Sequence, residues 1–253
     1  MNRITFLLIL SVFIVTSTAC SKNTHIMHEK YIFENSESSV LVFTKTEGWR
    51  HDSIEAGVEA VVELGRVNNF NVTWTEDSEY FTRENLSGYD AVVFLNTTLT
   101  VFNDTQRSAF KQYIQNSGGF VGVHSATDTE YDWAWYGELV GAYFDNHPPG
   151  VHEAVIEISD HNHPSTAHLD SEWIKTDEWY NFGYMNENVH VLMKLDTDSF
   201  EGSDHPGNHP ISWFHEFDGG RAFYTGLGHT KESFSDPVFL DHLLGGILYA
   251  KGR

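Results

Sequence analysis

The chain has 253 residues, enough for one α/β domain or two small ones, and carries 15 Lys and Arg against 36 Asp and Glu. A net charge of −21 opposes binding to phosphate backbones and to anionic lipid surfaces, so we expect no nucleic-acid partner. Aromatic residues make up 14% of the chain, which suits stacking on sugar rings but equally suits an ordinary protein core.

The N-terminus has the parts of a bacterial lipoprotein signal. Arg3 gives a short positive region, the apolar run 4–15 is too short to span a bilayer, and small residues precede the single cysteine, Cys20. The alternative is an ordinary secretory signal with a chance cysteine, since Ser17 stands where Leu is commonest. A domain held by disulfides would carry an even set of cysteines. We therefore predict a signal peptide over 1–19, lipidation at Cys20 and a chain anchored in the cell envelope, in the periplasm, outer membrane or cell surface.

Residues 20–38 are polar and lack periodicity, which predicts a lipidated cysteine and a flexible tether ahead of one domain, residues 39–253. Residues 40–44 and 70–75 predict strands around a helix that starts after Ser53, a candidate N-cap. Residues 89–95 predict a buried strand, 104–117 a helix and 120–124 the next strand. This alternation predicts an α/β fold, a doubly wound and mostly parallel sheet flanked by helices, with ligands at the carboxyl ends of the strands.

The second half of the chain is richer in β-structure. Residues 151–159 and 189–196 predict strands that flank an aromatic, acidic insertion at 170–184. Residues 211–216 and 221–225 predict a hairpin around Asp218-Gly219-Gly220, and residues 237–250 predict a closing helix. We therefore expect β-rich insertions in the second half of the domain.

The first group of candidate site residues follows the first predicted strand of the domain. Trp49, Arg50 and His51 lie in a loop at the carboxyl end of that strand, where loops often carry function. We predict that His51 takes part in proton transfer and that Trp49 and Arg50 contact substrate. The alternative is a solvated loop capped by Ser53.

The second group is the turn after residues 120–124, in which His124 stands at the tip of a strand-to-helix elbow. In α/β enzymes a Cys or Ser nucleophile takes this position. A histidine there excludes covalent chemistry of the amidotransferase type, and Ser125, which could be a nucleophile, lies one residue past the tip. An imidazole can still act as acid, base or metal ligand. We predict His124 as the central acid/base, with Asp128 as a catalytic neighbour and Ser125 as a substrate contact. The alternative is a buried histidine bonded to a backbone carbonyl.

The third group is a run of histidines in loop-like sequence between His147 and His242. Imidazoles near carboxylates make a divalent metal, zinc above all, a candidate cofactor, but the spacing matches no zinc motif and assigns no ligands. From this run we predict His229 as a catalytic residue. In Asp177-Glu178-Trp179-Tyr180 we predict that Glu178 and Trp179 contact substrate, the alternative being a surface turn anchored by Trp179.

At these residues the chain resembles the ThuA-like family, named for trehalose utilisation. The resemblance extends from residue 40 to residue 252 and rests on W-R-H-D-S-I at 49–54, residues 118–128, W-Y-G at 135–137, L-V-G-A at 139–142, H-P at 163–164, D-E-W-Y at 177–180, P-I-S-W at 210–213, Arg221, Y-T-G-L-G-H at 224–229 and D-P at 236–237. It implies a flavodoxin-like fold similar to class I glutamine amidotransferases, in which His124 replaces the elbow cysteine. It also implies a role in sugar metabolism, often on disaccharides oxidised to keto forms. The lipoprotein signal departs from the cytoplasmic members of the family.

We therefore expect an enzyme that acts on a glycoside or keto-sugar by hydrolysis, elimination or isomerisation. Each of these reactions begins with proton transfer near a carbonyl or glycosidic oxygen, which His124, His51, Asp128 and His229 could carry out. The alternative is a non-catalytic sugar-binding lipoprotein that delivers its ligand to a transporter or a partner enzyme. High aromatic content and the missing nucleophile favour that alternative.

Overall fold

The computed structural model of the protein describes residues 28–34 and 36–252. The predicted signal peptide over residues 1–19 and the predicted lipidation site Cys20 lie outside the described residues. Among the helices of the described part of the chain, none is both long enough and apolar enough to cross a membrane.

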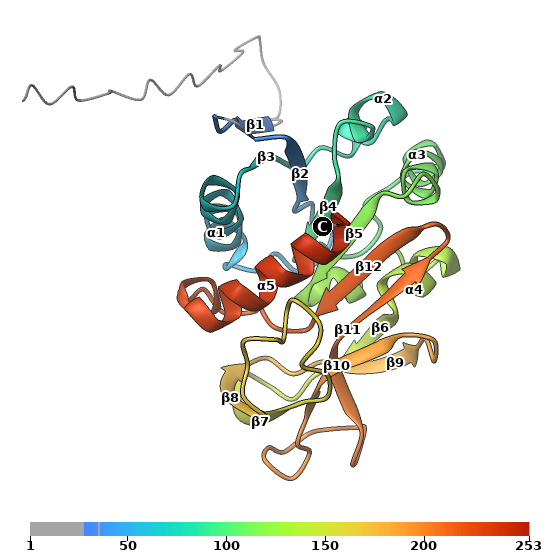
Figure 1. Cartoon of the computed structure of the whole chain (residues 1–253). Coiled ribbons are helices and arrows are strands. Elements are labelled where there is room, and N and C mark those ends of the chain that lie inside the picture. The colour runs from blue at the N-terminus through green and yellow to red at the C-terminus, as the bar shows by residue number, and fades with distance from the viewer. Residues whose placement is uncertain (1–27, 35, 253) are drawn as a thin grey trace, which may run out of the picture.

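Within the described residues, a ten-stranded sheet forms the centre of the structure (Figure 1). In spatial order its strands are β1 (His28–Tyr31), β3 (Phe70–Thr75), β2 (Ser38–Phe43), β4 (Ala91–Leu95), β5 (Gly119–Val123), β12 (Gly220–Thr225), β11 (His209–Phe217), β10 (His190–Leu195), β7 (His152–Ile158) and β8 (Glu172–Asp177). The strands from β3 to β12 are parallel to one another. The outer strands, β1 on one side and β11 to β8 on the other, pair in antiparallel fashion.

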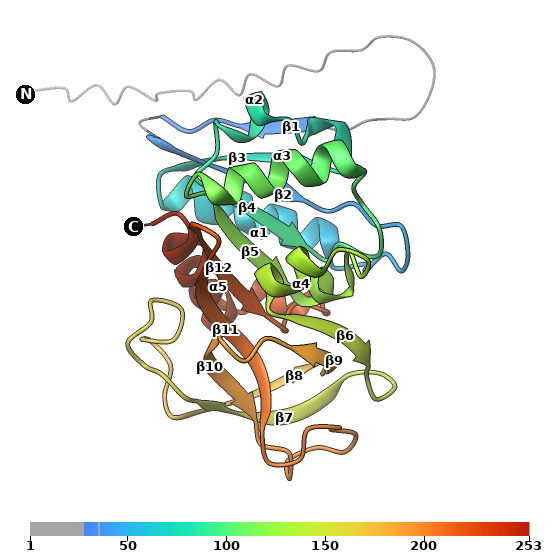
Figure 2. The same cartoon turned by 90° about the vertical axis from the view of Figure 1, so that its right-hand side faces the viewer.

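Helices cover both faces of the parallel strands. α1 (Ile54–Val67) and α5 (Pro237–Ala250) lie on one face, whereas α2 (Arg83–Leu86), α3 (Asp104–Gln115) and α4 (Ala134–Val140) lie on the other (Figures 1 and 2). Successive strand residues point to opposite faces, so Val42 packs in the core under α1 and α5 and Phe43 packs in the core under α3. The predicted doubly wound α/β fold with a β-rich second half is therefore confirmed.

Local sequence signals set the boundaries of the helices. In α1 the buried residues Ile54, Val58 and Val61 recur at the three- and four-residue spacing that gives a helix one apolar face. The start of α3 has a capping box, in which the Asn103 and Gln106 side chains each bind the backbone N–H of the other residue. α5 begins with Asp236 as its cap and Pro237 at the first helical position.

The second half contains elements that the sequence does not predict. The insertion at residues 170–184 supplies β8 and β9 (Asn181–Met185), and β9 pairs with β6 (Ala142–Asn146) in a separate two-stranded sheet. α4 has only seven residues and no side-chain cap, so its sequence signal is weak. Short turns of 3-10 helix, η1 (Ser78–Tyr80), η2 (His124–Asp128) and η3 (Glu232–Ser235), complete the fold.

The start of the folded part lies earlier in the chain than the predicted boundary at residue 39. Residues 28–31, which we predicted as part of the tether, form β1 and pair with β3 at the edge of the sheet. The pairing places His28 opposite Thr75 and Tyr31 opposite Val72. Residues 28–31 of the predicted tether are thus bound to the domain.

Ser53 precedes α1, as predicted, but its side chain does not cap the helix. The Ser53 hydroxyl instead donates to the carbonyl oxygen of Gly228 at 3.0 Å and accepts from the Asn96 side-chain amide at 2.9 Å. Ser53 is fully buried. Its hydrogen bond therefore ties the start of α1 to the loop that follows β12.

The antiparallel half of the sheet curls back toward the carboxyl end of β12. Four steps separate β12 from β8, and in a flat sheet with strands about 4.8 Å apart this would be about 19 Å. Asp177, the last residue of β8, nevertheless lies 2.9 Å from the backbone nitrogen of Gly228, measured from Oδ2. The Lys175 ammonium also binds the Asp236 carboxylate at 2.7 Å, which ties β8 to the start of α5. The curl brings residues after β8 beside residues after the parallel strands.

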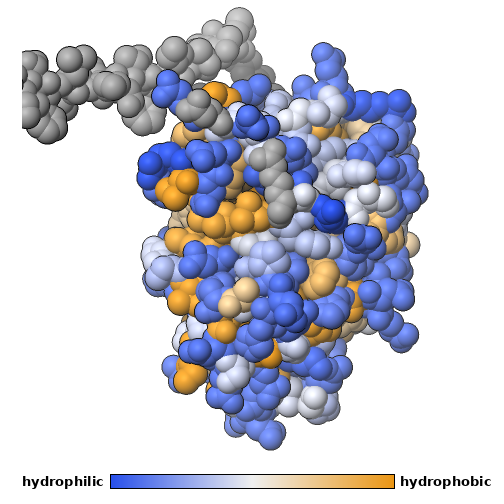
Figure 3. Space-filling view, viewed as in Figure 1, coloured by the Kyte–Doolittle hydropathy of each residue, from blue (hydrophilic) through white to orange (hydrophobic). Residues whose placement is uncertain are grey.

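Hydrophilic residues cover most of the face that Figure 3 shows, and hydrophobic residues appear between them in small groups.

Candidate active site

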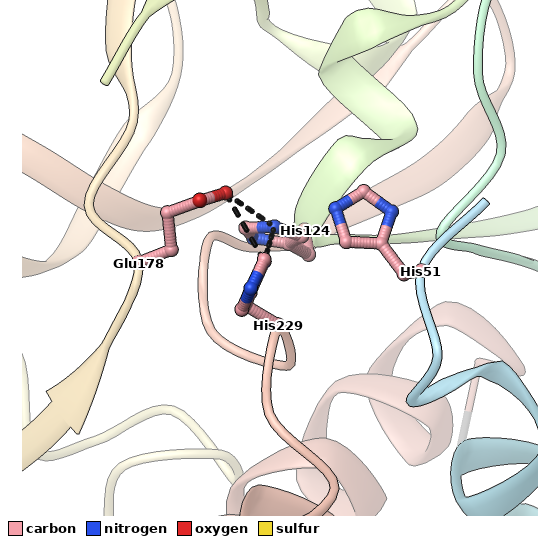
Figure 4. A group of neighbouring side chains, drawn as sticks. All are labelled: His51, His124, Glu178 and His229. Carbon is pink, nitrogen blue, oxygen red and sulfur yellow. Dashed lines mark hydrogen bonds and ion pairs between the residues drawn. The ribbon is translucent and has the colours of Figure 1, made fainter. Parts of the chain in front are cut away.

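Four side chains that can carry a proton or hold a metal converge at the carboxyl ends of the strands. His51, His124, Glu178 and His229 each direct one nitrogen or oxygen atom to a common point, and these atoms all lie within 4.8 Å of one another (Figure 4). His51 follows β2, His124 follows β5, Glu178 follows β8 and His229 lies after β12. Parallel strands bring their carboxyl ends to one edge of a sheet, and the curl adds Glu178 to that edge.

His124 occupies a strained elbow directly after β5. The strand ends at Val123, one residue earlier than predicted, and His124 has a φ of 49° in the left-handed region. Its Nδ1 lies 2.9 Å from the carbonyl oxygen of Gly226, so Nδ1 carries the hydrogen and Nε2 faces the cluster. Tyr224 donates its hydroxyl to the carbonyl oxygen of His124, and the Tyr180 ring lies 4.2 Å away, centre to centre. The elbow and the backbone-bonded histidine that we weighed as alternatives are therefore both present.

His124, His229 and Glu178 form a triangle of close contacts. His124 Nε2 lies 3.2 Å from His229 Nδ1 and 3.4 Å from Glu178 Oε2, and His229 Nδ1 lies 3.1 Å from the same oxygen. The other carboxylate oxygen, Oε1, lies 3.2 Å from His147 Nδ1. Glu178 is thus surrounded by imidazoles on both oxygens.

His51 lies on the other side of His124 from Glu178 and completes the cluster (Figure 4). Its ring centre lies 4.8 Å from that of His124 and 5.1 Å from that of His229, with both pairs nearly perpendicular. His51 Nδ1 lies 3.4 Å from Ser125 Oγ, which leaves Nε2 for the cluster. Ser125, which we predicted to contact substrate, is fully buried and contacts His51 instead.

Asp177 positions two members of the cluster through the backbone. Its fully buried carboxylate accepts the backbone N–H groups of Gly228, His229 and Glu178 at 2.9, 3.1 and 2.9 Å. The hydroxyl of Ser233 adds a fourth bond at 3.0 Å. These bonds hold the loop after β12 against the end of β8, and they fix the backbones that carry His229 and Glu178.

The environment separates the protonation states of the cluster residues. Burial, and then repulsion from His124 and His229, lowers the pKa of His51 to about 2, so His51 stays neutral. Burial raises the pKa of Glu178, but hydrogen bonds from His124 and His229 outweigh burial and hold this pKa well below its usual range. Burial lowers the pKa of His229, but its hydrogen bond to Glu178 outweighs burial and raises that pKa. The cluster therefore combines a carboxylate, a neutral imidazole and an imidazole that holds a proton readily.

Access to the cluster runs past His229. His124 has no exposed surface, and His51 and Glu178 are also buried. The His229 side chain is 26% exposed, and that of His147 is 34% exposed. A molecule that reaches the cluster from solvent therefore meets His229 before it meets His124.

The remaining predicted site residues lie outside the cluster. Trp49 is 72% exposed, and the Arg50 guanidinium is held by the carboxylates of Glu55 and Glu76 at 2.7 and 2.6 Å. Asp128 accepts the Tyr131 hydroxyl at 2.7 Å, and burial is the main cause that raises the pKa of Asp128.

Trp179 differs most from its prediction as a substrate contact. The structure places Trp179 in the core, where it is 1% exposed and its indole N–H donates to the carbonyl oxygen of His152 at 2.8 Å. The adjacent Glu178 follows the end of β8 at Asp177, and its carboxylate contacts the imidazoles of His124 and His229 instead.

Most of the histidines between His147 and His242 have structural roles. His209 and His242 are fully buried, and each has a ring nitrogen near a backbone carbonyl oxygen, of Tyr180 at 2.8 Å and of Ser165 at 2.9 Å respectively. His163 packs against Phe214 with ring centres 4.5 Å apart. Of that run, His147 and His229 contact Glu178.

Sequence reasoning did not identify the supporting roles of Asp177, Tyr180, Tyr224 and His147. Asp177 and Tyr180 carry a weak signal, because they flank Glu178 where an acidic pair meets aromatic residues. Tyr224 and His147 lie in the Y-T-G-L-G-H stretch and in the run of histidines, but these patterns do not assign their roles, because their contacts arise from tertiary packing.

A doubly wound α/β domain with a strained elbow after a central strand defines a protein of the class I glutamine amidotransferase-like fold, here with histidine in place of the nucleophile. The family model described as ThuA, trehalose utilisation, matches residues 39–250, and the chain belongs to this family. Membership links the protein to carbohydrate metabolism. No match is found among the curated proteins.

Solved structures agree with the fold. A ThuA-like protein from Bacteroides uniformis aligns with a TM-score of 0.73 at 22% identity, over 86% of this chain and 92% of that chain. A ThuA-like protein from Parabacteroides merdae gives 0.66 at 19% identity, over 85% of this chain and 90% of that chain. A β-galactosidase from Bacillus circulans aligns at 0.53 and 14% identity, over 86% of this chain but 31% of its own.

Proposed function

We propose that the protein is an enzyme of carbohydrate metabolism that acts on a glycoside or keto-sugar by hydrolysis, elimination or isomerisation. The observation that carries this proposal is the convergence of His51, His124, Glu178 and His229 at the carboxyl ends of the strands. Titratable groups with opposed pKa shifts gather at active sites because catalysis needs a proton donor beside an acceptor. The description of the family supports a sugar as substrate.

In all three reactions negative charge develops on a carbonyl or glycosidic oxygen in the transition state, so the site must place positive charge beside that oxygen. His229 is the partly exposed member of the cluster, so it delivers this charge as a proton. His124 acts behind it as the central acid/base, because its Nε2 lies 3.2 Å from His229 Nδ1 and can exchange a proton with that atom. Glu178 stabilises the imidazolium that forms, and His51 remains neutral beside it.

Exposed apolar side chains in the segments that follow the strands suit the faces of a sugar ring. Trp49, Leu99 and Tyr131 are large exposed side chains in the segments that follow β2, β4 and η2. Aromatic rings offer contact area with few torsions to fix, so they bind rigid apolar faces at low entropic cost. We propose that Trp49 stacks on the sugar.

We also propose that the protein is exported and anchored in the cell envelope through a lipid on Cys20. The run 4–15 and the small residues before Cys20 support this address. In bacteria grown with labelled palmitate, the full chain should incorporate label and a Cys20→Ser variant should not. Equal labelling of both chains would contradict the anchor.

The enzymatic proposal is tested by incubating the purified full chain with a panel of disaccharides and their 3-keto forms, with products detected by mass spectrometry. We expect turnover of at least one sugar, and its loss in a folded His124→Ala variant. His190→Ala is the matched control, because His190 is exposed on β10 and pairs with Asp160. Unchanged turnover in His124→Ala would contradict the assignment. Tight sugar binding by calorimetry without product would instead favour the non-catalytic binding protein.

A further inference from the structure

We infer that the cluster is a binding site for one divalent transition-metal cation of the zinc type, held by His124 Nε2, His229 Nδ1 and Glu178 Oε2, with His51 at the fourth position. The inference deepens the proposed function and rests on it for what the cation does in turnover. Binding itself depends on the ligand geometry alone and is tested separately.

The distances fit a tetrahedral metal. Ligand atoms about 2.0 to 2.1 Å from a tetrahedral zinc ion lie about 3.3 Å from one another. The three contacts among His124 Nε2, His229 Nδ1 and Glu178 Oε2 measure 3.2, 3.4 and 3.1 Å. These atoms therefore form one face of such a tetrahedron. His51 Nε2 faces the remaining corner, within the 4.8 Å that spans the whole set.

Hydrogen bonds among neutral imidazoles do not account for these contacts. His124 Nδ1 donates to the Gly226 carbonyl oxygen, so Nε2 of the neutral ring carries a lone pair. A carboxylate oxygen only accepts, so with a neutral His124 ring the 3.4 Å contact between His124 Nε2 and Glu178 Oε2 sets two acceptors against each other, and the contact needs a proton or a metal cation between the two atoms. The single hydrogen that His229 Nδ1 can carry points to one of these partners. A cation at the centre attracts all three lone pairs at once.

The atoms around the cluster provide the outer support that metal sites use. Metal-binding histidines usually bond their second ring nitrogen to a carbonyl, hydroxyl or carboxylate oxygen, which fixes the tautomer and the ring orientation. His124 Nδ1 does this with Gly226, and His51 Nδ1 lies near Ser125 Oγ. Asp177 fixes the backbones of Glu178 and His229. The ligands are thus held in place by groups other than one another.

The donor set selects the kind of cation. Three imidazoles and one carboxylate suit zinc and its transition-metal neighbours, whereas magnesium and calcium prefer oxygen ligands throughout. The bound cation would place positive charge at the point where the proposed reaction needs it, next to the exposed side of His229, and would take the place of the proton between His124 Nε2 and His229 Nδ1.

Binding is tested on the full chain purified without a histidine tag, stripped with EDTA and titrated with ZnCl2 by calorimetry. We expect one zinc ion per chain, with no comparable binding of MgCl2. His124→Asn is the variant that tests the ligand atom Nε2 most specifically. Its amide can keep the donor to Gly226, and Asn tolerates the left-handed backbone, but Nε2 is lost. We expect His124→Asn and His229→Leu to lower zinc affinity about 100-fold or more, since changes in outer partners alone cost 10- to 100-fold.

His190→Gln is the matched control and should bind zinc as the unaltered chain does. Circular dichroism and thermal melting should show that the variants fold. Absence of stoichiometric zinc binding in the unaltered chain, or unchanged affinity in folded His124→Asn, would overturn the inference. Zinc binding without turnover of any sugar would support the cation site and count against the proposed enzyme. Full turnover by the stripped chain that takes up no zinc would support the enzyme and overturn the site.

Discussion

The buried carboxylate of Asp177 accepts the backbone N–H of His229 at 3.1 Å, although the two residues are 52 positions apart in the chain. The same carboxylate binds the backbone of the adjacent Glu178 and of Gly228. Asp177 therefore sets the distance between Glu178 and His229 without being a member of the cluster.

Asp177→Asn should loosen this arrangement. The amide nitrogen would face backbone donors that the carboxylate now satisfies, and a buried unpaired group costs about 1–3 kcal/mol. We expect the free energy of unfolding to fall by about that amount and zinc affinity to fall about 10- to 100-fold. Urea denaturation and calorimetry measure the two effects. Ser233→Ala removes one of the bonds to Asp177 and should have the smaller effect on both. Unaltered zinc affinity in Asp177→Asn would contradict the positioning role.

Two variants should separate the catalytic role of His124 from its structural role. His124→Asn can keep the bond to the Gly226 carbonyl oxygen and suits the φ of 49°, whereas His124→Ala loses both advantages. We expect both variants to lose the activity found in the sugar screen, by about 100-fold or more, because proton transfer by a positioned group contributes about 10²–10⁴-fold. Thermal melting should show that His124→Asn is the more stable of the two. Activity retained in His124→Asn alone would show that Nε2 has no part in the reaction.

Trp49→Ala should weaken substrate binding more than it slows the reaction. Trp49 is exposed, so its removal leaves no cavity in the core. Aromatic stacking contributes about 0.5–1.5 kcal/mol, which predicts a KM raised about 2- to 10-fold at nearly constant kcat. Steady-state kinetics on the sugar identified by the screen measure this. Ile174→Ala, at an exposed position on β8, serves as the control. A fall in kcat at constant KM would contradict stacking in the ground state.

Three buried histidines should make the fold sensitive to mild acid. Burial lowers the pKa of His242 to about 3 and those of His163 and His209 to about 4, below the value of about 6.5 in an unfolded chain. Below pH 6.5 these histidines bind protons in the unfolded state but not yet in the folded state. The free energy of unfolding therefore falls as the pH falls from 6.5 toward the folded pKa values. Each group contributes about 1.4 kcal/mol per pH unit between its two pKa values.

Denaturation between pH 7.5 and 5, in EDTA to remove any metal, measures this slope. His242→Asn can keep the bond to the Ser165 carbonyl oxygen but cannot titrate, so its slope should be shallower. The exposed His190→Asn variant should keep the original slope. A stability that does not change between pH 6.5 and 5 would contradict the prediction.

The fold was largely predictable because its signals are local. Alternating apolar runs predict β2 to β5, and Pro237 with the apolar spacing after it predicts α5. The curl of β8 toward β12 was not predictable, since it is seen in contacts between segments far apart in the chain, such as Asp177 with Gly228 and Lys175 with Asp236. Prediction of the site is limited in the same way by contacts between distant segments. His51, His124 and His229 follow parallel strands and could be expected at one edge, whereas the partnership of Glu178 with two of them, and the burial of Trp179, depend on the curl.

The ion pair between Lys175 and Asp236, which ties β8 to the start of α5, has a consequence for folding. The parallel strands and their helices bring together three imidazoles that repel once protonated, and their carboxylate arrives only when β8 docks. A chain in which β8 has not yet docked therefore holds an incomplete site, and the docking of β8, through contacts such as that of Lys175 with Asp236, completes it. Contacts of such large sequence separation form slowly. The ability to bind zinc should thus appear during refolding together with the burial of Trp179.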